Sequence, residues 1–425
     1  MGSAATSANV PEILKNIWQD DIFDYMYEDE AFFGLVEKDT SWDGLYQIIT
    51  VMVDGMPGRS SNFDKGKANK GPPKFKKMQV DTNDNFVLWS VDHKLIALTR
   101  NQRGALVRAL AENTEKATTK LKRHTCYSFW GNGGGSFAKA NAVSTTTITS
   151  DTLTLVDAND VRFVDLDDIC EFAADDGYYA TAGVYSGTAK VVAIDEVNGK
   201  IQFDQNLANI SASISSAFLF HEGDYNNVFK GVPAYVTLND PGASDAYGSG
   251  TEPTTIWGMD RSSFKTRLGG HRFTGSNLLI IESLKKALML AFRRNVETTH
   301  LFMPPEVFND VEMSLQGARR YTTEKVGSVG YDALEFTSQG GKTVKAYSSP
   351  DIRKTRDGAK RVIWGLNMDH FKFHTAGEYP AWIAAAAGGG KFMTEQNANA
   401  TEGRLGGYGQ LYTDAAGQHW NLVLT

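Results

Sequence analysis

Residues 99–131, TRNQRGALVRALAENTEKATTKLKRHTCYSFWG, contain no proline and one internal glycine. Thr99 and Gln102 have the spacing of a capping box, which predicts that a helix begins here, and Gly131 is suited to its end. Apolar side chains recur along one face of this helix: Leu106, Leu110, Ala117 and Leu121. At 1.5 Å per residue the helix is a rod of about 45 Å. We expect it to form an axis of the fold.

A basic stretch precedes the helix. Residues 58–77, GRSSNFDKGKANKGPPKFKK, contain glycines and two prolines, which disfavour a helix or a central strand. Apolar and β-branched residues over 46–53 and 86–98 predict a strand on either side. We therefore expect an extended hairpin with a flexible basic tip, lying on another surface because its body is marginal alone. The basic residues are Arg59, Lys65, Lys67, Lys70, Lys74, Lys76 and Lys77.

Three interpretations of this basic tip remain open: a solvated loop, a nucleic-acid contact, or a contact with an acidic partner surface. The chain as a whole has a formal net charge of −7. Only Phe63 and Phe75 lie among the lysines, whereas nucleic-acid surfaces are broader and richer in aromatic residues. We favour an acidic surface on a partner subunit. The candidate counterparts are Asp20, Asp21, Glu28, Asp165, Asp167 and Asp168.

The remaining segments predict a mixed fold. Residues 11–39 hold more large aromatic side chains than a solvated tail requires, so we expect them to pack on something else, such as a neighbouring subunit. Residues 141–224 alternate as strands do, with Asn198-Gly199 as a two-residue hairpin turn, and predict an inserted small barrel or sandwich. Helices and strands alternate thereafter: helices at 276–294 and 305–318, strands at 299–305 and 361–374, and a hairpin at 333–349.

No residues form a recognisable reaction centre. The glycine-rich stretch 131–140 follows a helix and lacks the Gly-Lys-Ser/Thr of a phosphate loop. The acidic run 157–176 lacks the spacing of a calcium loop and predicts a solvated rim. His370 and His374 flank Lys372 on one strand face, a poor metal site, for which an exposed strand face is the simpler interpretation. We expect no enzyme activity, no cofactor and no bound metal.

Composition limits the cellular setting. Cys126 and Cys170 are the only cysteines, which argues for a reducing compartment and against a disulfide framework. No apolar stretch has the length of a membrane span, and the N-terminus lacks the pattern of a secretory signal. We expect a cytoplasmic product that does not enter a membrane.

The order of these elements resembles the major capsid protein of tailed bacteriophages, with its Hong Kong 97-like fold. The local stretches that carry the likeness are VFKGVPAYVTLNDP, TIWGMDRSSFKTRLGG (256–270), HLFMPPEVFNDVEMSL (300–315), GYDALEFTSQGGKTVKAYSSPDI, IWGLNMDHFKFH and GQLYTDAAGQHWNLVLT (409–425). The resemblance covers nearly the whole chain and lies in the order of the elements. It implies an α+β fold with an N-terminal arm, an extended loop, a spine helix, and peripheral and axial domains. The β-rich insertion lies outside this common core.

On that resemblance the chain divides into seven segments. They are the N-terminal arm (1–44), the extended loop (45–98), the spine helix of the peripheral domain (99–140), the β-rich insertion (141–228), the return segment of the peripheral domain (229–275), the axial domain (276–380) and the closing strands of the peripheral domain (381–425).

The resemblance also implies a function and partners. The chain would assemble as hexamers and pentamers into the icosahedral head of a virion, in the cytoplasm of a bacterial host, around double-stranded DNA without sequence-specific contact. Its other partners would be a portal and a separate scaffolding protein, or none, with a decoration protein left open. Two alternatives remain: an encapsulin-like compartment shell, and a nucleic-acid-binding protein that uses residues 58–77.

Overall fold

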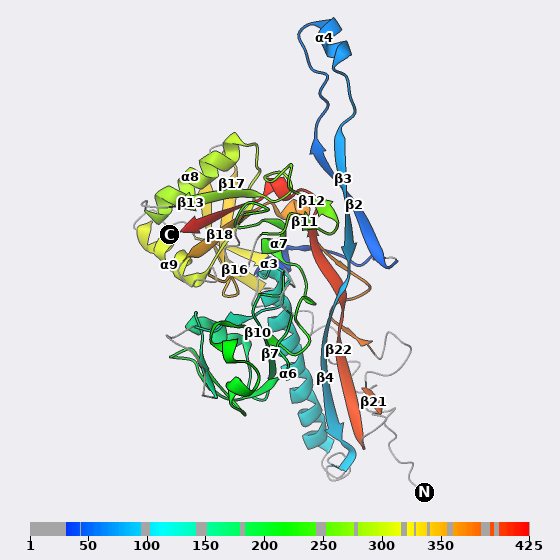
Figure 1. The fold of residues 1–425 in the computed structure, drawn as a ribbon, viewed down its shortest axis with the longest axis vertical. Helices are drawn as coiled ribbons and strands as arrows, with labels where there is room; N and C mark the ends of the chain where they lie inside the picture. Colours follow the sequence, from blue (N-terminus) through cyan, green and yellow to red (C-terminus); the bar gives the residue numbers. More distant parts are fainter. Residues whose placement is uncertain are drawn as a thin grey trace.

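The computed structural model gives an elongated molecule, with two bodies beside a long helix and a hairpin that extends from one end (Figure 1). The described residues are 31–42, 44–94, 103–141, 151–178, 183–243, 252–275, 279–315, 321–326, 329–337, 341–354, 360–383, 392–394 and 399–424.

The long helix is α6 (Arg103–Phe129), whose 27 residues make a rod of about 40 Å. The helix expected over 99–131 is thereby confirmed, although Thr99 and Gln102 lie outside the described residues. Ala117 and Leu121 are buried, as the apolar stripe predicts. The side chains of Leu106 and Leu110 lie outside the described part of the helix.

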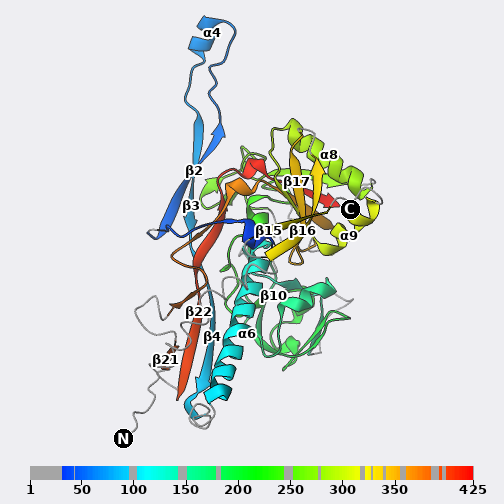
Figure 2. The same ribbon diagram turned by 180° about the vertical axis from the view of Figure 1, so that it is seen from behind.

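A six-stranded sheet runs beside α6 (Figures 1 and 2). Its central strand β22 pairs with β4 along ten residues, and Leu121 packs against Leu405 of β22. The sheet's strands are β1 (Glu37–Asp39), β4 (Asn83–Asp92), β19 (Phe371–Thr375), β20 (Ala381–Trp382), β21 (Phe392–Thr394) and β22 (Ala400–Thr413).

The inserted segment is a small barrel. Its six strands follow the order β5-β10-β7-β8-β9-β6, and a bridge between Ala140 and Leu155 joins the two ends of this path. A separate apolar core fills it. The β8–β9 turn spans four residues, 196–199, because Asp195 pairs with Lys200; the expected two-residue turn at Asn198-Gly199 is wrong. The strands are β5 (Ala138–Lys139), β6 (Thr152–Thr154), β7 (Ile169–Ala173), β8 (Ala189–Asp195), β9 (Lys200–Phe203) and β10 (Phe218–His221).

A seven-stranded mixed sheet forms the second body, with helices α8 (Ile280–Arg293) and α9 (Pro305–Ser314) packed beside it (Figure 1). Trp420 of β23 is fully buried in its core. The strands are β13 (His271–Gly275), β14 (His300–Met303), β15 (Tyr321–Val326), β16 (Val329–Thr337), β17 (Thr343–Ser348), β18 (Arg361–Leu366) and β23 (Trp420–Leu424).

Two expected strand assignments differ from the structure. Residues 361–374 do not form one strand, because Asn367 caps a 3₁₀ helix at Met368–His370 that sends β18 and β19 into different sheets. The closing segment 381–425 is divided in the same way: β22 lies in the six-stranded sheet, whereas β23 lies in the seven-stranded one.

The described end of the arm is buried in its own chain. Helix α3 (Ala31–Leu35) places Phe32 and Phe33 in the main core, and β1 pairs in parallel with β19. The aromatic residues of the arm that the structure describes therefore pack on another surface, as expected, but this surface is the body of their own chain and not a neighbouring subunit. The rest of that core comes in part from the return segment, which contains α7 (Val232–Tyr235), β11 (Thr255–Ile256) and β12 (Met259–Asp260).

Candidate functional site

The projecting hairpin is a two-stranded ribbon. It pairs β2 (Tyr46–Asp54) with β3 (Lys74–Asp81) and carries the short helix α4 (Phe63–Ala68) at its apex (Figure 1). The second strand was expected at 86–98, but most of that segment is β4, which pairs instead with the distant β22. The hairpin therefore closes earlier in the chain than the sequence suggested.

Buried side chains fix the base of the hairpin to the body. Val51 and Val53 of β2, with Met78 and Val80 of β3, lie in the main core. The guanidinium of Arg267 donates a hydrogen bond to Asp54 at 2.8 Å, and this bond holds the pKa of that carboxyl below its usual value. The direction in which the ribbon leaves the body is thus set by packing.

The opposite face of the ribbon is exposed and carries four large apolar side chains among polar ones. Tyr46, Ile48 and Met52 alternate along β2, and Phe75 lies directly across from Met52 on β3. Cross-strand partners share a face of a ribbon, so these side chains form one stripe. Several large apolar side chains exposed on one face are typical of a surface that contacts another molecule.

The tip of the ribbon contains the short helix α4, which the sequence argued against. The side-chain oxygen of Asn62 accepts hydrogen bonds from the backbone N–H groups of Asp64 and Lys65 at 3.0 and 3.3 Å and so caps α4. Glycine at 58 lets the two arms approach, because a Cβ there would lie 3.1 Å from the Cα of Lys70. Gly58 therefore allows the two backbone segments of the turn to approach each other closely.

The seven basic residues divide into two groups. Arg59, Lys65, Lys67 and Lys70 are exposed at the tip and have no ion-pair partner among the described residues. The remaining three, Lys74, Lys76 and Lys77, were expected at the tip but lie on β3, along the ribbon.

The expected acidic counterparts are already paired within the chain where the structure describes them. Asp168 accepts a hydrogen bond from Lys120, Asp165 lies 3.5 Å from Arg123, and Asp167 lies 2.7 Å from the Nζ of Lys190. The first two pairs connect the barrel to α6, and the third pair lies within the barrel. Asp20, Asp21 and Glu28 lie outside the described residues.

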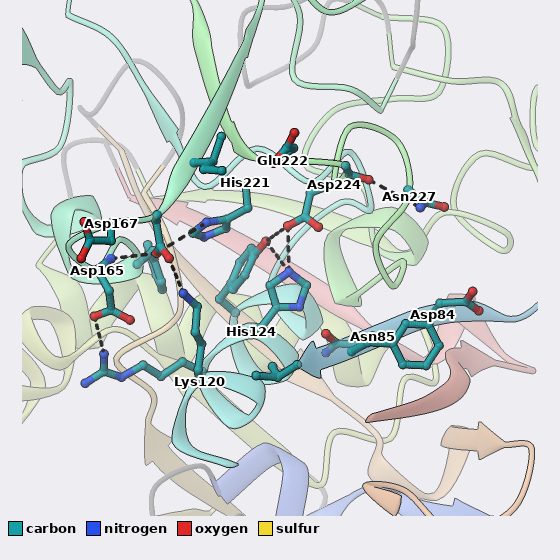
Figure 3. A pocket seen from close by; sticks show the side chains of 18 residues that line it. Asp84, Asn85, Lys120, His124, Asp165, Asp167, His221, Glu222, Asp224 and Asn227 are labelled. Atoms are coloured by element: carbon teal, nitrogen blue, oxygen red, sulfur yellow. Dashed lines mark hydrogen bonds and ion pairs between the residues drawn. The ribbon is translucent and has the colours of Figure 1, made fainter. Parts of the chain in front are cut away.

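A cleft of about 580 Å³ separates the barrel from α6 and β4 (Figure 3). Most of the side chains that line it are charged or polar, and they come from four separate segments of the sequence, 84–87, 120–127, 163–169 and 221–227. The charged and histidine residues of the cleft are Asp84, Lys120, Arg123, His124, Asp165, Asp167, Asp168, His221, Glu222 and Asp224.

Two histidines lie at the centre of the cleft. The Nε2 atom of His124 lies 2.8 Å from Asp224, which also accepts a hydrogen bond from Tyr127 at 3.3 Å. Burial alone would raise the pKa of Asp224, but His124, His221 and the hydrogen bond from Tyr127 together outweigh it and hold the pKa below its usual value. Burial lowers the pKa of His221, whose Nδ1 lies 3.9 Å from Asp168.

Two carboxylates at this cleft lack such partners. Asp84 and Glu222 are exposed and form no ion pair among the described residues. Burial raises the pKa of Asp84, and no nearby cation offsets that effect. Neither residue was a candidate from the sequence, since only the fold brings β4 beside the barrel.

The expected histidine face does not exist. His370 ends a 3₁₀ helix and lies 2.8 Å from Asp414, whereas His374 is fully buried with its Nε2 3.6 Å from Asp39. The interpretation as an exposed strand face is therefore wrong. Within the described part of the chain, no group of three or more His, Cys, Asp or Glu side chains is placed to hold a metal ion. None of the helices described is both long and apolar enough to cross a membrane.

Comparison with protein-family models and with curated proteins found no match. Among solved structures, the capsid asymmetric unit of cyanophage A-1(L) aligns over 91% of this chain and 89% of its own, with a TM-score of 0.48 and 10% identity. A structure of Mycobacterium phage Ogopogo aligns over 94% and 92%, with a TM-score of 0.43 and 9% identity. The holo-SrpI encapsulin complex from Synechococcus elongatus PCC 7942 aligns over 35% and 51%, with a TM-score of 0.25 and 12% identity.

Proposed function

We propose that this chain is a major capsid protein of a tailed bacteriophage, with a Hong Kong 97-like fold, and that it assembles as hexamers and pentamers into an icosahedral head. The observation that carries the proposal is the projecting hairpin. It extends well beyond the body that anchors it, its outer face exposes four large apolar side chains, and the cations of its tip have no ion-pair partner among the described residues. Such an element is covered only when another molecule packs on it.

The architecture supplies the other parts that this function requires. In this assignment α6 is the spine helix, the six-stranded sheet beside it belongs to the peripheral domain, and the seven-stranded sheet with α8 and α9 is the axial domain. The barrel is an insertion between the spine helix and the return segment. The described end of the arm contributes Phe32 and Phe33 to the main core of its own subunit.

Apolar burial supplies most of the affinity in this proposal. Covering a Leu-, Phe- or Met-sized side chain completely contributes about 1.5–3 kcal/mol, and the stripe presents four large side chains that are half exposed: Tyr46, Ile48, Met52 and Phe75. An exposed ion pair contributes only ~0–1 kcal/mol. The cations of the tip therefore set orientation and register, while the stripe supplies the binding energy.

The charge of the chain fits a shell around DNA. The inner wall of such a shell must not bind the packaged double-stranded DNA tightly. A formal net charge of −7 fits this requirement, because negative charges repel the phosphates of DNA. We propose the virion as the location of the protein, with assembly in the bacterial cytoplasm, and a scaffolding protein and a portal as its other partners.

The test is to express the chain, alone and with the genes encoded beside it, and to image the products by negative-stain electron microscopy. Closed shells, spirals or tubes support the proposal. Small discrete particles under both conditions would contradict it. Purified shells also separate the two shell classes: double-stranded DNA inside supports a phage head, and an enclosed enzyme supports an encapsulin-like compartment.

A further inference from the structure

The hairpin tip and the cleft beside the barrel lie far apart in the molecule. α4 marks one end of the long axis in Figures 1 and 2, whereas the barrel lies on the other side of the body. The base of the ribbon is held by Val51, Val53, Met78 and Val80 in the core. The tip of one chain therefore cannot reach the cleft of the same chain, and any contact between these two surfaces is intermolecular.

The cleft carries an excess of negative charge. Six carboxylates line it, against two permanent cations, Lys120 and Arg123. Asp84 and Glu222 remain without a partner at its edge (Figure 3), and burial raises the pKa of Asp84 because no cation offsets it. A cation brought to this edge would relieve that unfavourable burial of charge.

A few apolar side chains also line the cleft, and they come from both of its sides. Phe86 and Val87 line it from β4, and Phe163 and Ile169 line it from the barrel. Phe86 stacks edge-on with Tyr408 of β22 at a centroid distance of 5.4 Å, and Ile169 is 41% exposed. The cleft thus offers an aromatic and aliphatic slot with an acidic edge.

The tip has the complementary pattern. Phe63 begins α4 and is 81% exposed, so its ring is free to enter a slot. Arg59, Lys65, Lys67 and Lys70 belong to the same tip and have no ion-pair partner among the described residues, and Asp64 is the single acid between 58 and 77. An apolar anchor ringed by charges of one sign is typical of a docking element with a preferred orientation.

We propose that the hairpin tip of one subunit docks into the cleft between α6, β4 and the barrel of a second copy of this chain. Phe63 enters the apolar slot, and the lysines of α4 pair with Asp84 and Glu222 of the partner copy. This inference rests on the proposed function and adds the surface that receives the tip. It also assigns a function to the barrel, because the barrel forms one wall of the cleft that receives the tip.

Nucleic acid is a poor occupant for the same cleft, since six carboxylates repel a phosphate backbone. The contact between tip and cleft includes exposed ion pairs, so its strength should fall as salt is raised. The orientation given by apolar insertion should persist at high salt, which separates this contact from purely electrostatic attraction.

The experiment uses shells of the full chain with two engineered cysteines, Lys65→Cys at the tip and Glu222→Cys at the cleft. Both native cysteines, Cys126 and Cys170, are buried and do not compete. Treatment with a short bismaleimide should convert the subunits into a ladder of covalent oligomers on a denaturing gel. The matched control pairs Lys65→Cys with Glu196→Cys, an exposed residue in the β8–β9 turn outside the cleft, and should leave monomers.

The outcomes separate this inference from the proposed function. Intact shells with no ladder, or with equal ladders for both cysteine pairs, would overturn the docking and leave the capsid assignment standing. Failure of the unaltered chain to form shells would overturn both. A charge exchange gives independent evidence: Lys65→Glu with Lys67→Glu should cause loss of assembly, and adding Asp84→Lys with Glu222→Lys should restore it.

Discussion

The ring of Phe32 lies edge-on to the ring of Phe302, with 5.4 Å between their centroids. The first residue belongs to the arm and the second to β14 of the seven-stranded sheet. Phe32 also contacts Trp130, just beyond the end of α6, at 4.9 Å. One side chain from the arm therefore joins the long helix to the seven-stranded sheet.

Replacing Phe32 with alanine should destabilise the folded chain by about 3–5 kcal/mol, because the ring is fully buried and its removal leaves a cavity among other rings. Urea unfolding followed by tryptophan fluorescence measures this loss. Phe63→Ala is the matched control: that ring is exposed at the hairpin tip, so its removal should change stability by no more than about 0.5 kcal/mol. Equal effects of the two substitutions would contradict the assignment of the arm to the core.

Gly365 of β18 lies directly across from Trp420 of β23. A Cβ at this glycine would lie 2.0 Å from the indole ring, which is itself fixed by a 2.7 Å hydrogen bond from its Nε1 to Thr298. Gly365→Ala should therefore cost about 3 kcal/mol or more through overpacking, seen as a lower urea midpoint. Gly55→Ala is the control, since open space surrounds that position. A neutral Gly365→Ala variant would mean that the indole lies elsewhere.

The features that local pattern determines were predictable from the sequence. Residues 103–129 form the expected helix because they lack prolines and keep one apolar face. The barrel was foreseen for the same reason, since its strands alternate and its core is formed within one segment. In both cases the information lies within a short stretch of chain.

Features that depend on distant pairing were not predictable. The strand Lys74–Asp81 was not recognised in the sequence because its first residues are mostly lysines. A projecting ribbon exposes most of its side chains, so its strands need few apolar residues. β4 finds its partner more than three hundred residues later in β22. The cleft has the same origin: Asp84, His124 and Glu222 lie far apart in the sequence and share a site only through the fold.

The buried His419 should make the chain sensitive to acid. Its Nδ1 accepts a hydrogen bond from the backbone N–H of Asn367 at 3.1 Å, so the ring proton is on Nε2, 3.0 Å from the hydroxyl of Thr413. Burial lowers the pKa of His419 to about 3, whereas the unfolded chain binds this proton near pH 6.5. Above that pH the group contributes no pH dependence, and stability falls as pH drops from 6.5 towards 3.

The matching measurement compares urea unfolding of the wild type and of His419→Gln at pH 7 and pH 5. The wild type should lose about 2 kcal/mol more than the variant between these two values, from ~1.4 kcal/mol per pH unit below 6.5. Taking the difference within each protein removes the constant cost of the substitution. The same pH dependence in both proteins would show that His419 becomes protonated in the folded state.

Reversing the charge of the hairpin tip should abolish assembly and leave the subunit folded. Lys65, Lys67 and Lys70 are exposed and unpaired, so changing all three to glutamate removes no contact within the subunit. Electron microscopy reports shells, and circular dichroism with urea unfolding reports the fold. The control reverses three exposed lysines elsewhere, Lys94, Lys285 and Lys286, and so makes the same change in net charge. We expect shells from the control and folded, unassembled subunits from the tip variant, because charges at the tip set register while net charge alone does not. Normal shells from the tip variant would show that the basic residues of the tip are not required for assembly.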